Sequence, residues 1–273
     1  MSNYYDRIAH LYDATRPFPQ PVSEKIADYI LELVGATLET KFLEPGIGTG
    51  RTGLPIIRRG YPYTGIDISN EMMSELPLKL PRTMTNLTLI QGDASSLPLQ
   101  NDSFDVVLTT HVLQCLPDWQ VGLSEIRRVL KPSGIYLACE NLMPKYQKDF
   151  EVELKRILAQ YQPKSIDQPS SNQNAIIGPW KAGIEKVLSA QGADVETVTA
   201  ATWQAEQTVG ELFSVYESKA VGLCWAIADP VFSKAINEFK EWCHQNYDSF
   251  DTILSDSVNF DITVARHWSK LRA

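Results

Sequence analysis

The chain has 273 residues, of which 44% are hydrophobic and 21% charged, a composition that excludes a mainly disordered chain and a disulfide-stabilised miniprotein. Its 33 acidic and 25 basic side chains give a formal net charge of −8. Because this charge repels a phosphate backbone, we do not expect nucleic acid as a partner.

The four cysteines, Cys115, Cys139, Cys224 and Cys243, are scattered along the chain. They form no CxxC motif and no histidine stands at metal-ligand spacing from them, so we expect reduced thiols and no metal site. The first residues are polar, and no apolar stretch approaches the ~18 residues needed to cross a bilayer. These features predict a cytoplasmic protein without a membrane span.

Strand and helix patterns alternate in the first half of the chain. Apolar residues between Val22 and Val34 recur at helical spacing, and Gly35 follows where a helix C-cap belongs. The pattern then predicts a strand at 41–44, a helix at 51–59, a strand at 63–68, a helix from residue 69 or 70, strands at 87–91 and 105–110, a helix at 118–130 and a strand at 135–139. Several strands are apolar on both faces, which indicates an α/β protein whose parallel sheet is covered on both sides.

The rhythm changes in the second half, where helices dominate. The pattern predicts a charged helix at 146–162, a polar loop at 163–174, a helix at 179–191, a strand at 195–198, helices at 206–220 and 230–247, and an edge strand at 258–265. We see no internal repeat and no linker that would separate two independent domains.

The glycine-rich loop at 46–53 fits two patterns. Read from Gly48, GTGRTG matches the GxGxxG loop of dinucleotide sites, with Asp67 close to the ~20-residue offset of a ribose-binding carboxylate. Read from Glu44, the loop places glycines at every second position behind an acidic residue, so the backbone can approach a ligand without a pyrophosphate. A helix precedes the first strand and an acidic turn follows the third; both features favour the second pattern.

Four motifs extend that second pattern through the first half of the chain. They are E-x-G-x-G-x-G from Glu44, G-I-D-I-S from Gly65, G-D-A-x-x-L-P from Gly92 and R-V-L-K-P-x-G from Arg128. Together they resemble the class I S-adenosylmethionine-dependent methyltransferases, in particular the small-molecule group that contains the ubiquinone and menaquinone biosynthesis enzymes. The resemblance implies a Rossmann-like, seven-stranded, mostly parallel sheet with the last strand antiparallel, helices on both faces, and S-adenosyl-L-methionine as the cofactor.

The same resemblance implies how the chain is organised. We expect a single methyltransferase domain over 1–273, with an N-terminal lid at 1–38 and the cofactor-binding core at 41–141. Two helical insertions, at 142–192 and 199–257, are expected to cap the substrate pocket.

The resemblance assigns cofactor-binding roles to residues that follow the strands. The glycines leave room for the methionine end of the cofactor, Asp67 accepts both ribose hydroxyls, and Asp93 accepts from the adenine amino group. A tyrosine and an arginine from the N-terminal segment close over the cofactor, the arginine on its carboxylate. The full set of expected cofactor-binding residues is Tyr12, Arg16, Glu44, Gly46, Gly48, Gly50, Asp67, Ile68, Asp93, Ala94 and Thr110.

Purely structural roles stay open for four of these residues. Asp67 and Asp93 also suit helix caps, because a carboxylate at a strand end often accepts from the first turn of a helix. Arg16 also suits a surface position, and Glu44 also suits a role in shaping the loop.

The acceptor side carries less information. His111, just after the fourth strand, is the candidate catalytic residue, either as a general base or, as we favour, as a hydrogen-bonding residue that shapes the pocket. The fourth strand ends in T-T-H-V and lacks the Asn/Asp-Pro-Pro-aromatic element of relatives that methylate nucleobase or glutamine amines. We therefore expect methyl transfer to a small metabolite, aromatic or carboxylate-bearing, with the acceptor atom left open. The alternatives are a nicotinamide-dependent oxidoreductase and a non-catalytic cofactor-binding scaffold.

Overall fold

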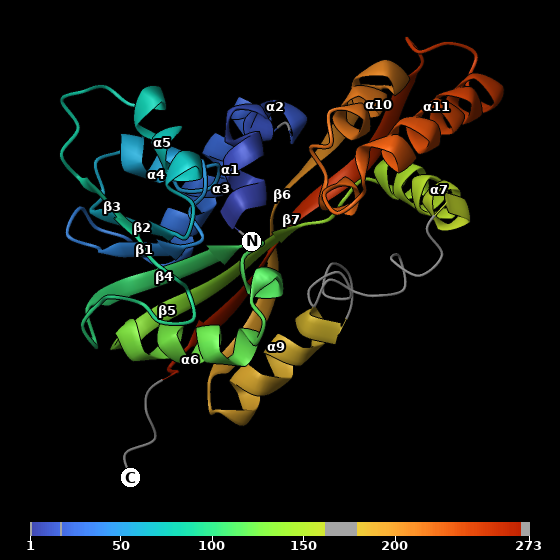
Figure 1. Ribbon diagram of the computed structural model, residues 1–273. Coiled ribbons are helices and arrows are strands. Elements are labelled where there is room, and N and C mark those ends of the chain that lie inside the picture. Colours follow the sequence, from blue (N-terminus) through green and yellow to red (C-terminus); the bar gives the residue numbers. More distant parts are fainter. Residues whose placement is uncertain (1, 17, 162–178, 269–273) are drawn as a thin grey trace. The chain divides into compact units, whose positions relative to one another are not determined.

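The structure is a computed structural model that describes residues 2–16, 18–161 and 179–268 (Figure 1). It divides into two compact units, which we call the first unit and the second unit. The first unit comprises Met1–Glu140, Asn172–Ala201 and Phe260–Ala273, and the second comprises Asn141–Ser171 and Thr202–Asn259. The polar loop expected at 163–174 lies outside the described residues. No helix in the described ranges is long and apolar enough to cross a membrane.

The first unit contains the glycine-rich loop and most of the strands. Its elements, with strands that continue into the second unit given in full, are α1 (Ser2–Ile8), η1 (Ala9–Leu11), α2 (Tyr12–Thr15), α3 (Gln20–Leu33), β1 (Phe42–Pro45), α4 (Leu54–Arg58), β2 (Tyr63–Asp67), α5 (Asn70–Ser74), η2 (Pro77–Lys79), β3 (Leu87–Gln91), β4 (Phe104–Thr110), η3 (Leu113–Cys115), α6 (Trp119–Val129), β5 (Leu130–Asn141), α9 (Pro179–Ala190), β6 (Asp194–Thr208) and β7 (Ile253–Arg266).

The sheet has seven strands in the order β3-β2-β1-β4-β5-β7-β6. The pairs β1–β2, β1–β4, β2–β3 and β4–β5 are parallel, and β7 is antiparallel, which confirms the predicted fold class. Because parallel strands end at the same edge of a sheet, Pro45, Asp67 and Thr110 deliver the loops that follow β1, β2 and β4 to one place.

Helices cover both faces of the sheet in the first unit, with α6 and α9 on one face and α3, α4 and α5 on the other (Figure 1). In α6 the Asp118 side chain caps the helix by accepting from the Gln120 amide. The apolar stripe of α6 shares a core with the sheet and α9, with members that include Leu43, Val107, Leu123, Ile126, Tyr136, Ile184 and Leu188. This core holds the strand ends in place under the loops.

The structure corrects three of the predicted elements. The helix expected at 51–59 begins at Leu54, because Pro55 has no N–H to donate and therefore belongs in the first turn. The strand expected at 195–198 continues to Thr208, so the helix expected at 206–220 starts only at Val209. The C-terminal strand is wrong as an edge strand: β7 lies between β5 and β6, and β6 forms the edge.

The second unit is built on helices α7 (Lys145–Tyr161), α10 (Val209–Glu217) and α11 (Asp229–Asn246), with the short η5 (Gly222–Cys224). A capping box at Thr208 and Glu211 starts α10. The helices enclose an aromatic core in which Phe150 packs edge-to-face on Phe239, with ring centroids 5.5 Å apart. Of the four cysteine thiols, Cys115 is half-buried and the other three are buried.

A buried pair of polar side chains joins the ends of β1 and β2 in the first unit. The Tyr63 hydroxyl donates to Oε2 of Glu44 at 2.7 Å, and the Glu44 residue is only 2% exposed. Burial raises the pKa of Glu44 to about 8 and raises that of Tyr63 above its ordinary value. A Cβ at Gly53 would lie 2.5 Å from the Tyr63 hydroxyl, so the loop glycine makes room for the pair. At neutral pH Glu44 is therefore mainly a neutral acid.

This shift predicts a pH-dependent stability. The folded state keeps the Glu44 proton that the unfolded state releases near pH 4.5, so the free energy of unfolding should fall as pH rises from about 4.5 to about 8. The contribution of this one group is at most about 1.4 kcal/mol per pH unit. Urea unfolding of the wild type and of Glu44→Gln between pH 5 and 8.5 measures it. The variant should show a shallower decline, and parallel profiles would contradict the assignment.

Candidate cofactor and acceptor site

The loop after β1 is shaped by glycines in left-handed backbone conformations. Gly46 has φ +74° and Gly50 has φ +80°, values that side chains disfavour. A Cβ on Gly46 would lie 2.5 Å from Val112, and one on Gly50 would lie 2.5 Å from Leu76. Side chains at these two positions would therefore clash with the protein, so the loop can follow this path only with glycines there.

Asp67, at the end of β2, holds the loop in that conformation. Its Oδ2 accepts from the Gly48 amide at 2.8 Å, and its Oδ1 accepts from the Ser69 amide at 2.9 Å. Burial raises the pKa of Asp67 above its ordinary value, although these two amides oppose the rise. Each carboxylate oxygen has a second lone pair, so Asp67 can still accept from a ligand while it holds the loop.

The residues expected around the adenine lie after β2 and β3. Ile68 is 46% exposed, which leaves an apolar side chain uncovered next to Asp67. Asp93 is exposed, and its Oδ1 accepts from the Ser95 amide at 2.7 Å, which closes a turn around the half-buried Ala94. Asp93 thus closes a turn and does not cap a helix, and its second oxygen makes no hydrogen bond within the described residues.

The N-terminal segment, residues 2–16, is fastened over the loop by polar contacts. The Asp13 carboxylate accepts from the Thr49 hydroxyl at 2.6 Å and forms an ion pair with Lys79, whose Nζ also donates to the Thr49 carbonyl at 2.8 Å. The Arg16 guanidinium lies 4.4 Å from the centre of the Tyr12 ring. This segment therefore places an aromatic ring and a cation next to the glycine-rich loop.

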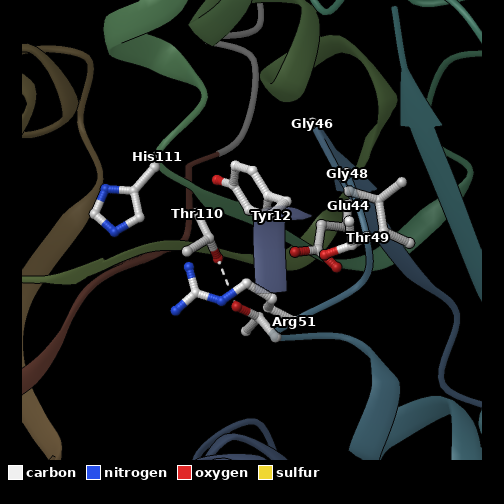
Figure 2. A pocket seen from close by; sticks show the side chains of 10 residues that line it. Tyr12, Glu44, Gly46, Gly48, Thr49, Arg51, Thr110 and His111 are labelled. Atoms are coloured by element: carbon white, nitrogen blue, oxygen red, sulfur yellow. Dashed lines mark hydrogen bonds between the residues drawn. The ribbon is translucent and has the colours of Figure 1, made fainter. Parts of the chain in front are cut away.

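These elements surround a small pocket with a cavity of about 40 Å³ (Figure 2). The structure brings six of the expected site residues together in its wall: Tyr12, Glu44, Gly46, Gly48, Thr110 and His111. The remaining lining residues, which sequence reasoning did not assign to the site, are Ile47, Thr49, Arg51 and Thr52. The other expected residues are not part of this wall: Arg16, Gly50, Asp67, Ile68, Asp93 and Ala94. Asp67 is linked to the wall because it accepts a hydrogen bond from the Gly48 amide.

The end of β4 supplies the polar groups on the far side of the pocket from the glycines. The Thr110 hydroxyl donates to the Thr52 hydroxyl at 3.1 Å (Figure 2). His111 has φ +55°, a strained conformation for a residue with a side chain. Its Nδ1 lies 3.2 Å from the Gln114 amide nitrogen. When that amide donates to Nδ1, the ring proton is on Nε2, so a neutral His111 offers a donor.

A signal for the unassigned residues was present in the sequence. Arg51 follows Gly50 directly and Thr52 follows Arg51, so both belong to the loop whose backbone the glycines shape. The prediction of a helix over 51–59 placed them on a helix instead, and thereby hid their position in the pocket.

Comparison with known proteins finds relatives of the first half of the chain. Residues 43–138 match the model of a methyltransferase domain family. The demethylmenaquinone methyltransferase of Staphylococcus aureus is 35% identical over 118 residues, which are 42% of this chain and 48% of that protein. The chain thus matches about half the length of this curated relative.

Solved structures share the fold over nearly the whole chain. The [4+2]-cyclase SpnF superimposes with a TM-score of 0.58 and 18% identity, covering 97% of this chain and 94% of the cyclase. Phosphoethanolamine N-methyltransferase 2 of Haemonchus contortus, solved with S-adenosyl-L-methionine, gives a TM-score of 0.54 and 18% identity, covering 96% of this chain and 57% of that one. At these identities the likeness establishes the fold alone. Residues 43–138 therefore match the class I S-adenosylmethionine-dependent methyltransferase family, and the glycine-rich loop lies within the matched range.

Proposed function

We propose that the chain transfers a methyl group from S-adenosyl-L-methionine to a small-molecule acceptor. The observation that carries this proposal is the meeting of three strand ends at one edge of the sheet: the glycine-rich loop after β1 and Thr110 with His111 at the end of β4 line the pocket, and Asp67 at the end of β2 holds the loop through the Gly48 amide. The family match over 43–138 supports the same reaction.

The residues present fit the cofactor. Gly46 and Gly48 line the pocket with backbone alone, and Asp67 keeps lone pairs for two hydroxyl groups. In this proposal the loop from Gly46 to Gly50 holds the methionine end, Asp67 the ribose, and Ile68, Asp93 and Ala94 the adenine. Tyr12 and Arg16 cover the site, with Arg16 on the cofactor carboxylate.

The chain's own contribution to the reaction is mainly positioning. When bound, the cofactor supplies an electrophilic methyl group on a sulfonium, which an acceptor atom attacks in line. The protein must hold both partners at near-attack distance and exclude water, which can supply much of the acceleration. We propose that His111 shapes the acceptor side of the pocket and donates a hydrogen bond from Nε2, rather than acting as a general base.

The acceptor class follows from charge and pocket size. The net charge of −8 argues against nucleic-acid acceptors, and Tyr12 of the N-terminal segment forms part of the pocket wall. A cavity of about 40 Å³ is far below the roughly 300–1,000 Å³ of sites for drug-sized ligands, and we propose that the N-terminal segment, which contributes Tyr12 to the wall, moves to admit cofactor and acceptor. The cysteine thiols are compatible with a reducing compartment such as the cytoplasm.

The two alternative functions make different predictions for ligand binding. SpnF has the same fold and is a cyclase, so the fold by itself does not fix the reaction. Isothermal titration of the protein with S-adenosylhomocysteine and with NADH tests the cofactor directly. We expect binding of S-adenosylhomocysteine and none of NADH. The reverse result would favour an oxidoreductase. Cofactor binding without methyl transfer from labelled S-adenosylmethionine to any small molecule of a metabolite extract would favour a scaffold.

Asp67 provides the sharpest variant for the cofactor site. Replacing it with alanine removes the acceptor for the ribose hydroxyls and for the Gly48 amide, so the affinity for S-adenosylhomocysteine should fall at least about tenfold. Asp251→Ala, which removes an exposed carboxylate of the second unit, is the matched control and should leave the affinity unchanged. Equal affinities in calorimetry for Asp67→Ala and the wild type would contradict the ribose role.

A Lys79 variant tests whether the N-terminal segment slows the release of ligand from the site. Because Lys79 ties Asp13 to the Thr49 carbonyl, Lys79→Met should speed dissociation of S-adenosylhomocysteine by about two- to fivefold, the effect of losing one partly exposed ion pair. Stopped-flow displacement measures the rate, with the exposed Lys25→Met as control. If both variants release the ligand at the wild-type rate, the segment does not gate the site.

A further inference from the structure

Arg51 is a cation of the pocket wall to which neither the family motifs nor the proposed cofactor contacts give a role. It lies in the turn between Gly50 and α4 and lines the pocket together with Tyr12, Thr110 and His111 (Figure 2). Its Nε is buried and has no hydrogen-bond partner within the described residues. The guanidinium lies 5.2 Å from the centre of the Phe18 ring, so one of its neighbours is apolar.

The surrounding charges do not neutralise Arg51. In the described part of the chain no carboxylate lies within ion-pair distance of it; Asp13, which is near enough to attract its charge, is paired with Lys79 and bonded to Thr49. Glu44 lines the same pocket, but its pKa of about 8 keeps it mainly neutral at pH 7. Burial lowers the pKa of Arg51 and the nearby Arg16 lowers it further, while Tyr12 and Asp13 oppose this fall.

A cation in this position is costly without an anion. A buried charge without a partner costs several kcal/mol, whereas a guanidinium that meets a carboxylate forms two charge-assisted hydrogen bonds of matched geometry. Arginine differs in this respect from lysine, because its planar fork selects planar anions and its charge persists at any physiological pH. The site around Arg51 is therefore built for a carboxylate that the protein itself does not supply.

The position of the guanidinium indicates which ligand brings that carboxylate. Figure 2 shows it extending away from Gly46 and Gly48 and toward the side of the pocket where Thr110 and His111 lie. That side follows β4 and is the acceptor side in the function proposed above, on which this inference rests. The single carboxylate of the cofactor is assigned to Arg16. We propose that Arg51 binds a carboxylate of the methyl acceptor, which makes the acceptor a carboxylic acid.

The experiment compares carboxylates with a neutral analogue. The probes are acetate, benzoate and benzamide, titrated by calorimetry and by ligand-observed NMR into protein loaded with S-adenosylhomocysteine. We expect acetate and benzoate to bind and benzamide not to bind. In Arg51→Met the carboxylate affinity should fall at least about tenfold, with a smaller loss in Arg51→Lys, which keeps the charge but not the fork. Arg82→Met, which removes an exposed arginine, is the control.

A second pair of ligands separates the acceptor from the cofactor. S-adenosylhomocysteine carries the amino-acid carboxylate and methylthioadenosine lacks it. If Arg51 serves the acceptor, Arg51→Met changes the affinity for both by less than about threefold. A tenfold loss for S-adenosylhomocysteine with none for methylthioadenosine would overturn the proposal and assign Arg51 to the cofactor.

Two further results would also overturn it: no carboxylate binds the wild type, or carboxylates bind wild type and Arg51→Met equally. If Arg51→Met fails to fold, two comparisons still test the proposal: the carboxylate affinity of Arg51→Lys against that of the wild type, and the binding of benzoate against benzamide by the wild type. Failure of the wild type to bind S-adenosylhomocysteine would refute the proposed methyl transfer instead, and the carboxylate titration of the unloaded protein would then test Arg51 by itself.

Discussion

The hydrogen bond from the Gly48 amide to Asp67 connects the two strand ends on which the site depends. It is possible only because β1 and β2 are parallel neighbours that end at the same edge, with Glu44 in register with Gly65. The left-handed glycines turn the loop toward Asp67, and Asp67 in turn fixes the loop. A cofactor would therefore meet a preformed backbone surface, which reduces the ordering that binding requires.

Two ionisable groups in the pocket wall, the buried Glu44 and the half-buried Arg51, meet the loss of solvent in opposite ways. Glu44 escapes the cost of a buried charge by keeping its proton and accepting from Tyr63. Arg51 keeps its charge, because a guanidinium does not lose its proton at physiological pH. The first group acts as a neutral part of the sheet core, and the second leaves a positive potential in a pocket of an acidic protein. This contrast is the physical basis for the preference we propose for an acidic acceptor.

The sequence predicts the order of strands and helices in the first unit well, because short-range patterns determine these elements. Alternation of strand and helix, the glycine spacing and the acidic strand ends specify the order of elements and bring Glu44, Gly46, Gly48, Thr110 and His111 to one pocket. The errors have local causes. The pattern predicts a strand that ends at 198 and a helix that begins at 206, whereas β6 continues to Thr208 and the helix begins only at Val209. The role of Arg51 depends on charges that come from distant parts of the chain, and no spacing rule reports these.

The most direct measurement is a crystal structure of the protein with S-adenosylhomocysteine. We expect the ligand along the Gly46–Gly50 backbone, with its ribose hydroxyls on Asp67 and the N-terminal segment displaced from its present position. A structure in which the ligand binds elsewhere, or in which Asp67 contacts only the Gly48 and Ser69 amides while the ribose lies away from it, would contradict the proposed cofactor site.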